Sequence, residues 1–173
     1  MPRLYVVATP IGNLGDLSGR VRDALAGADL IAAEDTRVAM KLLNHLGLSK
    51  PTISCHRHNE RSRAAELVAR MQGEDLTVAL TSDAGTPAIS DPGHILVDAA
   101  WAAGIPVVPI AGPSALATAL SAAGFDAAEF GFFGFLPRER GRLREKLSAI
   151  RALNLRVAVA HESPHRVVAL VDE

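Results

Sequence analysis

The order of apolar and polar residues divides most of this chain into short segments of alternating kind. Apolar runs of four to six residues predict buried strands. Longer segments between them carry apolar residues near helical spacing, which is typical of amphipathic helices. The expected strands are residues 4–9, 30–33, 52–55, 76–81 and 107–110, and the expected helices are residues 18–26, 36–46, 60–72, 92–103 and 114–123.

Residues that begin and end helices support several of these boundaries. Asp35 is a favourable N-cap for the helix that starts at residue 36, and Asn59 is one for the next helix. Gly73 is expected to end that second helix. Asp91 is expected to cap the helix over 92–103, with Pro92 in its first position, where a missing N–H has no cost.

Five strand–helix units in about 124 residues predict an α/β fold, with a parallel sheet and helices on both faces. After Gly124 the pattern changes, and the expected elements are strands at 129–136 and 155–160 and helices at 138–153 and 164–171. We therefore expect an N-terminal α/β domain over residues 1–124 and the beginning of a second α/β domain over residues 125–173. With two strands and no closing element, the second domain is expected to be incomplete.

Composition favours a folded protein in a reducing compartment. Hydrophobic residues make up 49% of the 173 residues, enough for a core, and the single cysteine, Cys55, cannot form an internal disulfide. Residues 99–125 carry no formal charge, but prolines and glycines divide them into helix, strand and helix rather than a membrane span. Because no signal-peptide core follows the N-terminus, we expect a soluble cytoplasmic protein without a membrane segment.

Polar and glycine-rich residues follow each expected strand. In an open parallel sheet the carboxyl ends of the strands share one edge, and ligands bind there. Five segments fall at this edge: TPIGNLGD (9–16), EDTR (34–37), HRHNE (56–60), TSDAGTPAISDPG (81–93) and AGPSA (111–115). A capped turn also explains each segment alone, so their shared position carries more weight than any single one.

Two other kinds of site are disfavoured. Glu34 and Asp35 lie 19 and 20 residues after Gly15, as in a dinucleotide site, but the loop offers G-x-x-G where the fingerprint needs G-x-G-x-x-G. No G-K-[S/T] occurs, which excludes a P-loop. His56 and His58 alternate at a strand end and are expected to point to opposite faces, so we expect no metal site.

A strongly basic segment lies near the start of the second domain. Residues 138–156 hold seven basic and two acidic side chains, in a chain of formal charge −1. A solvated helix face explains most charge runs, but this local excess favours a polyanion such as RNA. The candidate RNA-binding residues are Arg138, Arg140, Arg142, Arg144 and Lys146.

Together the motifs resemble those of the ribosomal RNA small-subunit methyltransferase I family, a branch of the tetrapyrrole methylase superfamily. The segments that carry the resemblance are TPIGNLGD, EDTR, HNE, SDAGTPAISDPG, the Gly-Pro-Ser-Ala turn, GFLP and HESPHR, in this order. It covers essentially all 173 residues. It implies S-adenosylmethionine-dependent methylation of a cytidine ribose 2′-hydroxyl in 16S rRNA of the 30S subunit, in a bacterial cytoplasm and usually by a homodimer.

The resemblance also implies a fold and a cofactor site. The fold has two α/β domains with the cofactor in the cleft between them, and family members continue past the position of residue 173. Porphyrin-type members have a G-D-P turn where this chain has residues 82–84, which leaves the register of contacts over 84–89 open. Carried onto this sequence, the cofactor contacts are Pro10, Asp83, Ala84, Gly85, Ile89, Ser114 and Ala115.

Methyl transfer from a sulfonium requires alignment of the ribose oxygen with the methyl group, and a base or a polarising cation helps a poor nucleophile. No metal is required. Asp83 is better suited to accept from cofactor hydroxyl or amine groups than to act as the base. Two alternatives stay open: a small-molecule methylase of the porphyrin type, and a non-catalytic RNA-binding fragment. The catalytic candidates are Glu34, Arg37 and Glu60, with Asp35 and His56 on the same edge.

Overall fold

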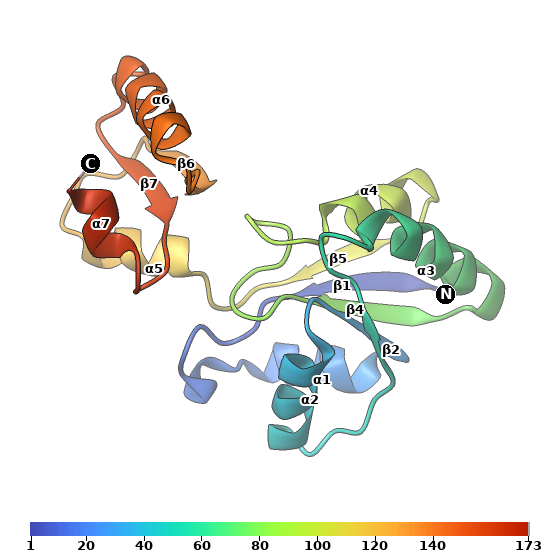
Figure 1. Ribbon diagram of the computed structural model, residues 1–173. Coiled ribbons are helices and arrows are strands. Elements are labelled where there is room, and N and C mark those ends of the chain that lie inside the picture. Colours follow the sequence, from blue (N-terminus) through green and yellow to red (C-terminus); the bar gives the residue numbers. More distant parts are fainter. Residues whose placement is uncertain (173) are drawn as a thin grey trace. The chain divides into compact units, whose positions relative to one another are not determined.

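The computed structural model describes residues 1–172. The chain divides into two compact units, one over Met1–Ala115 and one that begins at Leu116 (Figure 1). All of the cofactor and catalytic candidates at the predicted sheet edge belong to the first unit. The expected domain boundary after Gly124 stays a prediction.

The first unit is built on a five-stranded parallel sheet. Its strands are β1 (Arg3–Val7), β2 (Leu30–Ala33), β3 (Thr52–Ser54), β4 (Thr77–Thr81) and β5 (Val107–Ile110). They are ordered β3-β2-β4-β1-β5, with Val6 of β1 opposite Leu80 on one side and Pro109 on the other. Because all five strands run in one direction, their carboxyl ends share one edge, which confirms the predicted fold class.

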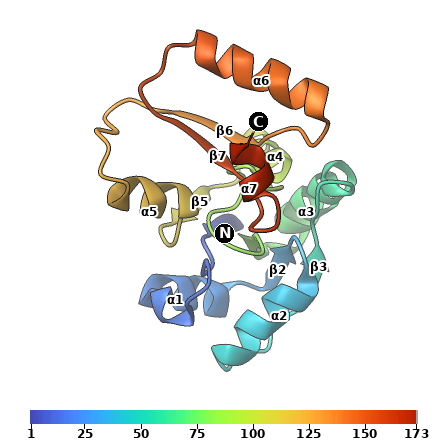
Figure 2. The same ribbon diagram turned by 60° about the vertical axis from the view of Figure 1, so that its left-hand side comes forward.

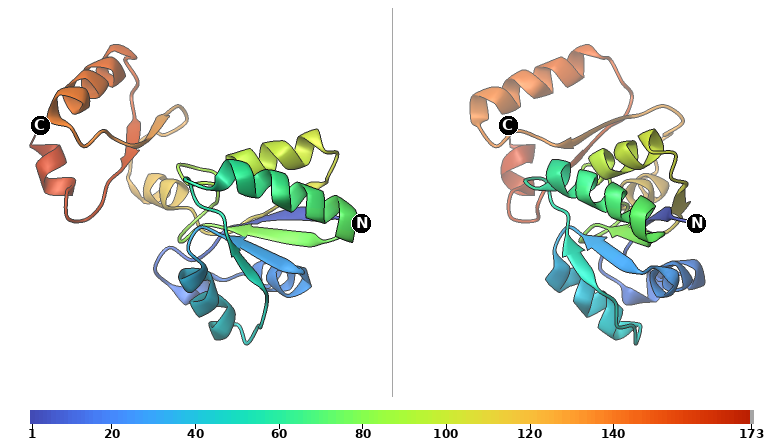
Figure 3. Two further views of the ribbon diagram at one scale, coloured as in Figure 1. Left: turned by 45° about the vertical axis from the view of Figure 1, so that its right-hand side comes forward. Right: turned by 90° about the vertical axis from the view of Figure 1, so that its right-hand side faces the viewer.

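Helices cover both faces of this sheet, as the left view of Figure 3 shows. They are α1 (Gly19–Gly27), α2 (Thr36–His45), α3 (Glu60–Glu74) and α4 (His94–Ala102), with a short 3-10 turn η1 (Leu14–Asp16). On one face α3 and α4 bury Leu67 and Leu96 against Leu80. On the other face α1 and α2 bury Leu25 and Leu43. Each fully buried leucine contributes about 1.5–3 kcal/mol of transfer free energy, so the two layers fix the sheet edge in place.

Helix α3 ends later than Gly73, which corrects the expectation from the sequence. The helix runs to Glu74, and the next residue, Asp75, takes the left-handed conformation with φ +56°. Aspartate tolerates this conformation better than most side chains. Its carboxylate also accepts a hydrogen bond from the N-terminal amine of Met1 at 3.1 Å. Asn59 precedes α3, but its side chain makes no capping bond to the helix.

Helix α4 begins at His94 rather than Pro92, so the predicted cap by Asp91 is wrong. The N-cap is Gly93, whose φ is +124°. A Cβ at this position would lie 2.7 Å from Leu80 Cδ2, so both the backbone conformation and the close approach favour glycine. The capping group comes from α3: Glu60 accepts hydrogen bonds from the backbone N–H groups of Gly93 and Ile95.

The second unit contains a pair of parallel strands and its helices. Its elements are α5 (Ala115–Ala122), which starts at the last residue of the first unit, β6 (Gly131–Phe135), α6 (Arg140–Ala152), β7 (Ala158–His161) and α7 (Val167–Val171). Figure 2 shows β6 and β7 side by side, and the ring of His161 packs edge-to-face on Phe132 and Phe135. Among residues 1–172, no helix is long and apolar enough to cross a membrane.

Candidate functional site

The loops after β1 and β4 are held together by backbone pairing. Thr9 and Gly85 exchange two N–H···O hydrogen bonds of 2.8 and 3.0 Å. The Thr9 hydroxyl donates a third bond to the carbonyl of Ser82 at 3.1 Å. Thr9 and Ser82 are both buried, so these bonds are shielded from water. The first half of TSDAGTPAISDPG is therefore fixed against TPIGNLGD.

The loop after β5 joins the same arrangement. The Thr86 hydroxyl donates to the carbonyl of Pro113 at 3.2 Å. Gly85 has φ +86°, and a Cβ there would lie 3.4 Å from Ile11 Cγ2 and 3.9 Å from the Pro113 carbonyl oxygen. Three chain segments thus approach closely around this glycine, which explains why a side chain is disfavoured here.

The structure brings the predicted cofactor residues to one edge of three adjacent strands. They follow β1, β4 and β5, which are neighbours in the order β4-β1-β5. Asp83, Ala84, Ile89 and Ala115 are exposed, whereas Gly85 is buried within the backbone pairing. The remaining two, Pro10 and Ser114, are half-buried. The arrangement offers small side chains and accessible backbone to a ligand at this edge.

The second half of TSDAGTPAISDPG has an unusual backbone. Ala88 and Ser90 have φ of +66° and +68°, a region that side chains other than glycine, asparagine and aspartate seldom occupy. The Ala88 N–H donates to the carbonyl of Pro92, and the Arg57 guanidinium donates to the carbonyl of Ser90 at 3.1 Å. Such conformations cost about 1–3 kcal/mol each and persist where surrounding contacts fix them. Arg57 was not among the residues predicted from the sequence, although it lies within HRHNE.

Carboxylates from two loops meet beside the Thr9–Gly85 pair. Asp83 Oδ1 accepts the N–H of Asp35 at 3.0 Å, and Glu34 Oε2 accepts the N–H of Asp83 at 3.4 Å. Burial raises the pKa of the Glu34 carboxyl above its ordinary value, and the charge of Asp83 raises it further. Burial likewise raises the pKa of Asp83. Two adjacent carboxyl groups at this edge thus both have raised pKa values.

Asp35 and Arg37 form a separate ion pair. The Asp35 carboxylate caps α2 by accepting the N–H of Arg37 at 2.8 Å, which confirms the predicted N-cap, and Arg37 Nη2 donates to Asp35 Oδ2 at 2.6 Å. The side chain of Arg37 is 86% exposed. The hydrogen bonds from Arg37 lower the pKa of Asp35 to about 2. Arg37 therefore has a local carboxylate partner and holds the start of α2.

Replacing Arg37 with alanine is expected to raise the pKa of Asp35 from about 2 towards its ordinary 3.8. A depressed carboxyl pKa contributes stability above the unfolded value of 3.8, and that contribution is lost as the pH falls towards 2. In Arg37→Ala this contribution is expected to shrink at every pH above about 2, because the folded-state pKa of Asp35 then lies closer to its unfolded value. Carbon-detected NMR titration of the Asp35 carboxyl measures the shift directly, and an unchanged pKa would contradict the pairing.

Glu60, a catalytic candidate, is placed away from the edge cluster. Its side chain is 2% exposed, and Oε1 accepts the N–H groups of Gly93 and Ile95 at 2.7 and 2.8 Å. Two backbone bonds in a buried setting indicate a structural acceptor, because the oxygen has no access to a substrate. Glu60 fastens the far end of the TSDAGTPAISDPG loop, and the sequence pattern gave no sign of this partner.

The two histidines of HRHNE are not on opposite faces as predicted. Strand β3 ends at Ser54, so His56 and His58 lie in the turn that follows, with their ring centroids 6.0 Å apart in an edge-to-face arrangement. Strand alternation therefore does not apply to them. Within residues 1–172, no group of three His, Cys, Asp or Glu side chains is arranged to hold a metal ion.

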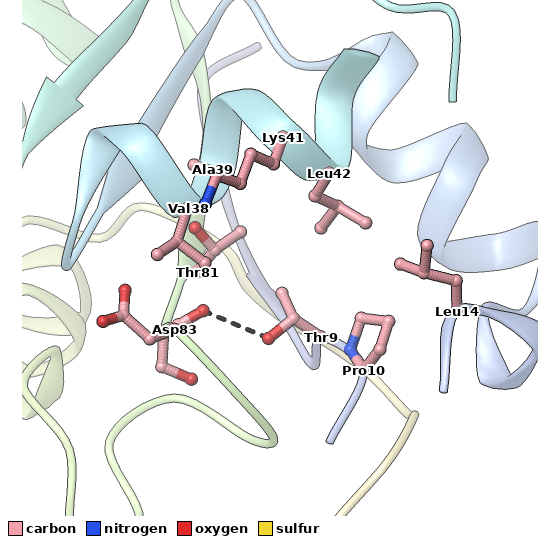
Figure 4. A pocket seen from close by; sticks show the side chains of 10 residues that line it. Thr9, Pro10, Leu14, Val38, Ala39, Lys41, Leu42, Thr81 and Asp83 are labelled. Carbon is pink, nitrogen blue, oxygen red and sulfur yellow. Dashed lines mark hydrogen bonds between the residues drawn. The ribbon is translucent and has the colours of Figure 1, made fainter. Parts of the chain in front are cut away.

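A cavity of about 290 Å³ lies between the β1 and β4 ends and helix α2 (Figure 4). We call it the α2 cavity. Much of its wall is apolar, and Thr81 contributes a buried hydroxyl with no hydrogen-bond partner among the described residues. The lining residues are Thr9, Pro10, Leu14, Val38, Ala39, Lys41, Leu42, Thr81, Ser82 and Asp83. Of these, Pro10 and Asp83 were predicted from the sequence as ligand contacts, whereas the α2 residues resemble ordinary helix positions.

Comparison with known proteins gives consistent results. The sequence profile of the family described as Tetrapyrrole (Corrin/Porphyrin) Methylases matches residues 3–173. Over 166 residues the chain is 49% identical to the Ribosomal RNA small subunit methyltransferase I of Vibrio cholerae serotype O1, a match that covers 96% of this chain and 57% of that protein. The protein of the same name from Pseudomonas aeruginosa is 48% identical over 165 residues, 95% of this chain and 58% of that protein. The chain therefore spans a little over half the length of these relatives, and the resemblance drawn from the motifs is confirmed.

Solved structures show the same fold at much lower identity. A diphthine synthase superposes with a TM-score of 0.68 at 16% identity, covering 95% of this chain and 66% of that one. The uroporphyrin III C-methyl transferase of Thermus thermophilus gives 0.67 at 17% identity, covering 98% and 74%. At these identities the likeness shows the fold alone.

Proposed function

This chain belongs to the tetrapyrrole (corrin/porphyrin) methylase family, and we propose that the protein carrying it is an S-adenosylmethionine-dependent methyltransferase that acts on ribosomal RNA. The modified group in this proposal is the 2′-hydroxyl of a cytidine ribose in 16S rRNA of the 30S subunit. The names of the relatives support an RNA substrate. A cytoplasmic location and a homodimer belong to the same proposal and await direct tests.

The observation that carries the proposal is the joining of the β1, β4 and β5 ends around Gly85. Backbone segments approach Gly85 closely and its chain neighbours are small, which fits a ligand that lies against the main chain. Carboxylates at the same edge, Glu34 and Asp83, suit a cofactor with a positively charged sulfonium and an ammonium group. When bound, S-adenosylmethionine supplies a methyl group already activated for transfer. The residues that would hold it are Pro10, Asp83, Ala84, Gly85, Ile89, Ser114 and Ala115.

Among the three catalytic candidates, the contacts favour Glu34 as the proton acceptor. Arg37 is paired with Asp35, and Glu60 is buried as the cap of α4. Glu34 is half-buried beside Asp83, and its raised pKa makes it a better base than an ordinary carboxylate. In the proposed reaction, Glu34 would accept the proton of the ribose hydroxyl while that oxygen bonds to the methyl carbon, the methyl–sulfur bond breaks and S-adenosylhomocysteine leaves.

Helix α6 is the proposed contact for RNA phosphates. Its buried side is marked by Leu143, while Arg140, Arg142, Arg144 and Lys146 on the helix, and Arg138 just before it, are all exposed. Some of this charge is locally balanced, since Arg142 pairs with Glu139 at 3.1 Å. The excess of basic residues along the segment remains, and phosphate contacts of this kind give affinity without sequence readout.

Asp83→Asn is expected to weaken binding of S-adenosylhomocysteine about tenfold or more, as expected for loss of a charge-assisted hydrogen bond. Asparagine keeps an oxygen that can accept the Asp35 N–H, so the loop is expected to hold its shape. Isothermal calorimetry measures the dissociation constant, with Asp98→Asn on the exposed side of α4 as the control. Equal affinities for Asp83→Asn and the unchanged protein would argue against this cofactor site.

A further inference from the structure

The α2 cavity and the proposed cofactor segments lie on different sides of the Thr9–Gly85 pair. Strand β2, which leads into α2, is beside β4, whereas β5 is on the far side of β1. Thr86 bonds to the loop after β5, while Thr81 faces the cavity under α2. The two sides are not independent, because Pro10 and Asp83 line the cavity and also belong to the proposed cofactor contacts. They are therefore adjoining spaces that share one edge.

The size and lining of the α2 cavity suit a small, partly apolar ligand. The volume of about 290 Å³ is just below the range of roughly 300–1,000 Å³ for small-molecule sites. Leu14, Val38 and Leu42 provide apolar surface, as Figure 4 shows. Leu14 is 48% exposed although it lines a cavity, so its apolar surface is available to a ligand.

Thr81 supplies the polar signal within this apolar surface. The residue is 4% exposed, and its Oγ1 has no hydrogen-bond partner among the described residues. A buried hydroxyl without a partner carries a free-energy cost of about 1–3 kcal/mol, so it marks a place where a ligand atom can complete the bonding. Asp83 and Lys41 add charged groups to the lining.

We propose that the α2 cavity binds the base of the acceptor nucleotide. The inference rests on the proposed function, in which donor and acceptor need adjoining subsites so that the reacting atoms meet. The base leaves its stack to enter the cavity, packs against the apolar side chains of η1 and α2, and meets the Thr81 hydroxyl at its polar edge. This places the attached ribose near Asp83, whose N–H bonds to Glu34.

Cytidine titration of the 15N-labelled 173-residue chain tests the proposal by NMR. Saturable shifts are expected at the amides of Val38, Leu42 and Thr81, and S-adenosylhomocysteine is expected to act at Gly85 and Ser114 instead. Thr81→Val removes the hydroxyl while keeping the shape, and should weaken cytidine binding about fivefold. Its thermal stability should be unchanged or higher, because an unpartnered buried hydroxyl is lost. Thr77→Val, at the opposite end of β4, is the matched control and should bind cytidine normally.

A second variant guards against indirect effects of Thr81→Val. Val38→Phe fills the cavity from the wall of α2 and should abolish the cytidine shifts while S-adenosylhomocysteine still binds. The proposal is overturned if cytidine shows no saturable binding, or if its shifts fall at Gly85 and Ser114 and disappear with S-adenosylhomocysteine. It is also overturned if S-adenosylhomocysteine itself shifts Val38 and Leu42, because the cavity would then belong to the cofactor.

The two titrations separate the base site from the proposed function. Cytidine binding at α2 without any binding of S-adenosylhomocysteine, either to this chain or to the protein that carries it, would sink the methyl-transfer proposal and leave a nucleoside site. Binding of S-adenosylhomocysteine without cytidine would reject the base site and leave the methyl-transfer proposal in place.

Discussion

Glu60→Ala is expected to lower the free energy of unfolding of the first unit by about 3–5 kcal/mol, because one buried and one part-buried N–H group lose their carboxylate acceptor. The N–H groups belong to Gly93 and Ile95 at the start of α4, at 2.7 and 2.8 Å from the same carboxylate oxygen. Glu60→Gln keeps an acceptor oxygen and is expected to lose about 1–2 kcal/mol. Urea unfolding followed by the fluorescence of Trp101, the single tryptophan, reports on α4 itself.

The control for this comparison is Glu66→Ala on the same helix. Glu66 is half exposed and pairs with Arg63, so its loss is expected to cost less than about 1 kcal/mol. Glu60→Ala should also free the TSDAGTPAISDPG loop and weaken S-adenosylhomocysteine binding. A Glu60→Ala protein of normal stability that has lost only methyl transfer would show that Glu60 is catalytic after all.

Glu34→Gln is expected to reduce kcat for methyl transfer about 10²–10⁴-fold, the usual contribution of a general base. Glutamine keeps the side-chain oxygen that accepts the Asp83 N–H but cannot take up the ribose proton. The affinity for S-adenosylhomocysteine is therefore expected to change little. The control for a glutamate-to-glutamine change is Glu74→Gln, at an exposed glutamate on the C-terminal end of α3.

The pH dependence distinguishes a base from a purely structural carboxylate. Burial and Asp83 raise the pKa of Glu34, so the acid form persists to higher pH than in an ordinary glutamate. A base works only when deprotonated, so kcat should rise with pH through the pKa of Glu34 and then level off. Glu34→Gln should remove this rise. A kcat within about twofold of the unchanged protein would exclude Glu34 as the base.

Much of the fold follows from the local pattern of the sequence. Strands β2 and β5 were predicted to the residue, because a short apolar run between two helical segments is typical of a buried strand. The N-cap of α2 was predicted correctly because the Asp35 carboxylate bonds to its own helix. The position of the polar loops at one sheet edge could also be predicted, because it requires only that the strands be parallel and not a particular strand order.

The remaining features depend on contacts that sequence separation hides. Glu60 caps a helix that starts 34 residues later, and no local rule connects it to Gly93. The same holds for the α2 cavity, where Val38 and Leu42 look like ordinary apolar helix positions until α2 is placed beside Thr81. The cap of α4 and the wall of the α2 cavity, which both need a long-range partner, were therefore misplaced or left open by the sequence.

The central claim is that the edge formed by β1, β4 and β5 serves methyl transfer to ribosomal RNA. Its most direct test is transfer of labelled methyl from S-adenosylmethionine to 30S subunits, using a preparation of the protein carrying this chain that binds S-adenosylhomocysteine. The account predicts label in 16S rRNA that is recovered after nucleoside digestion as 2′-O-methylcytidine. Label on a base, or label on a uroporphyrinogen-type substrate with none on the 30S subunit, would contradict it.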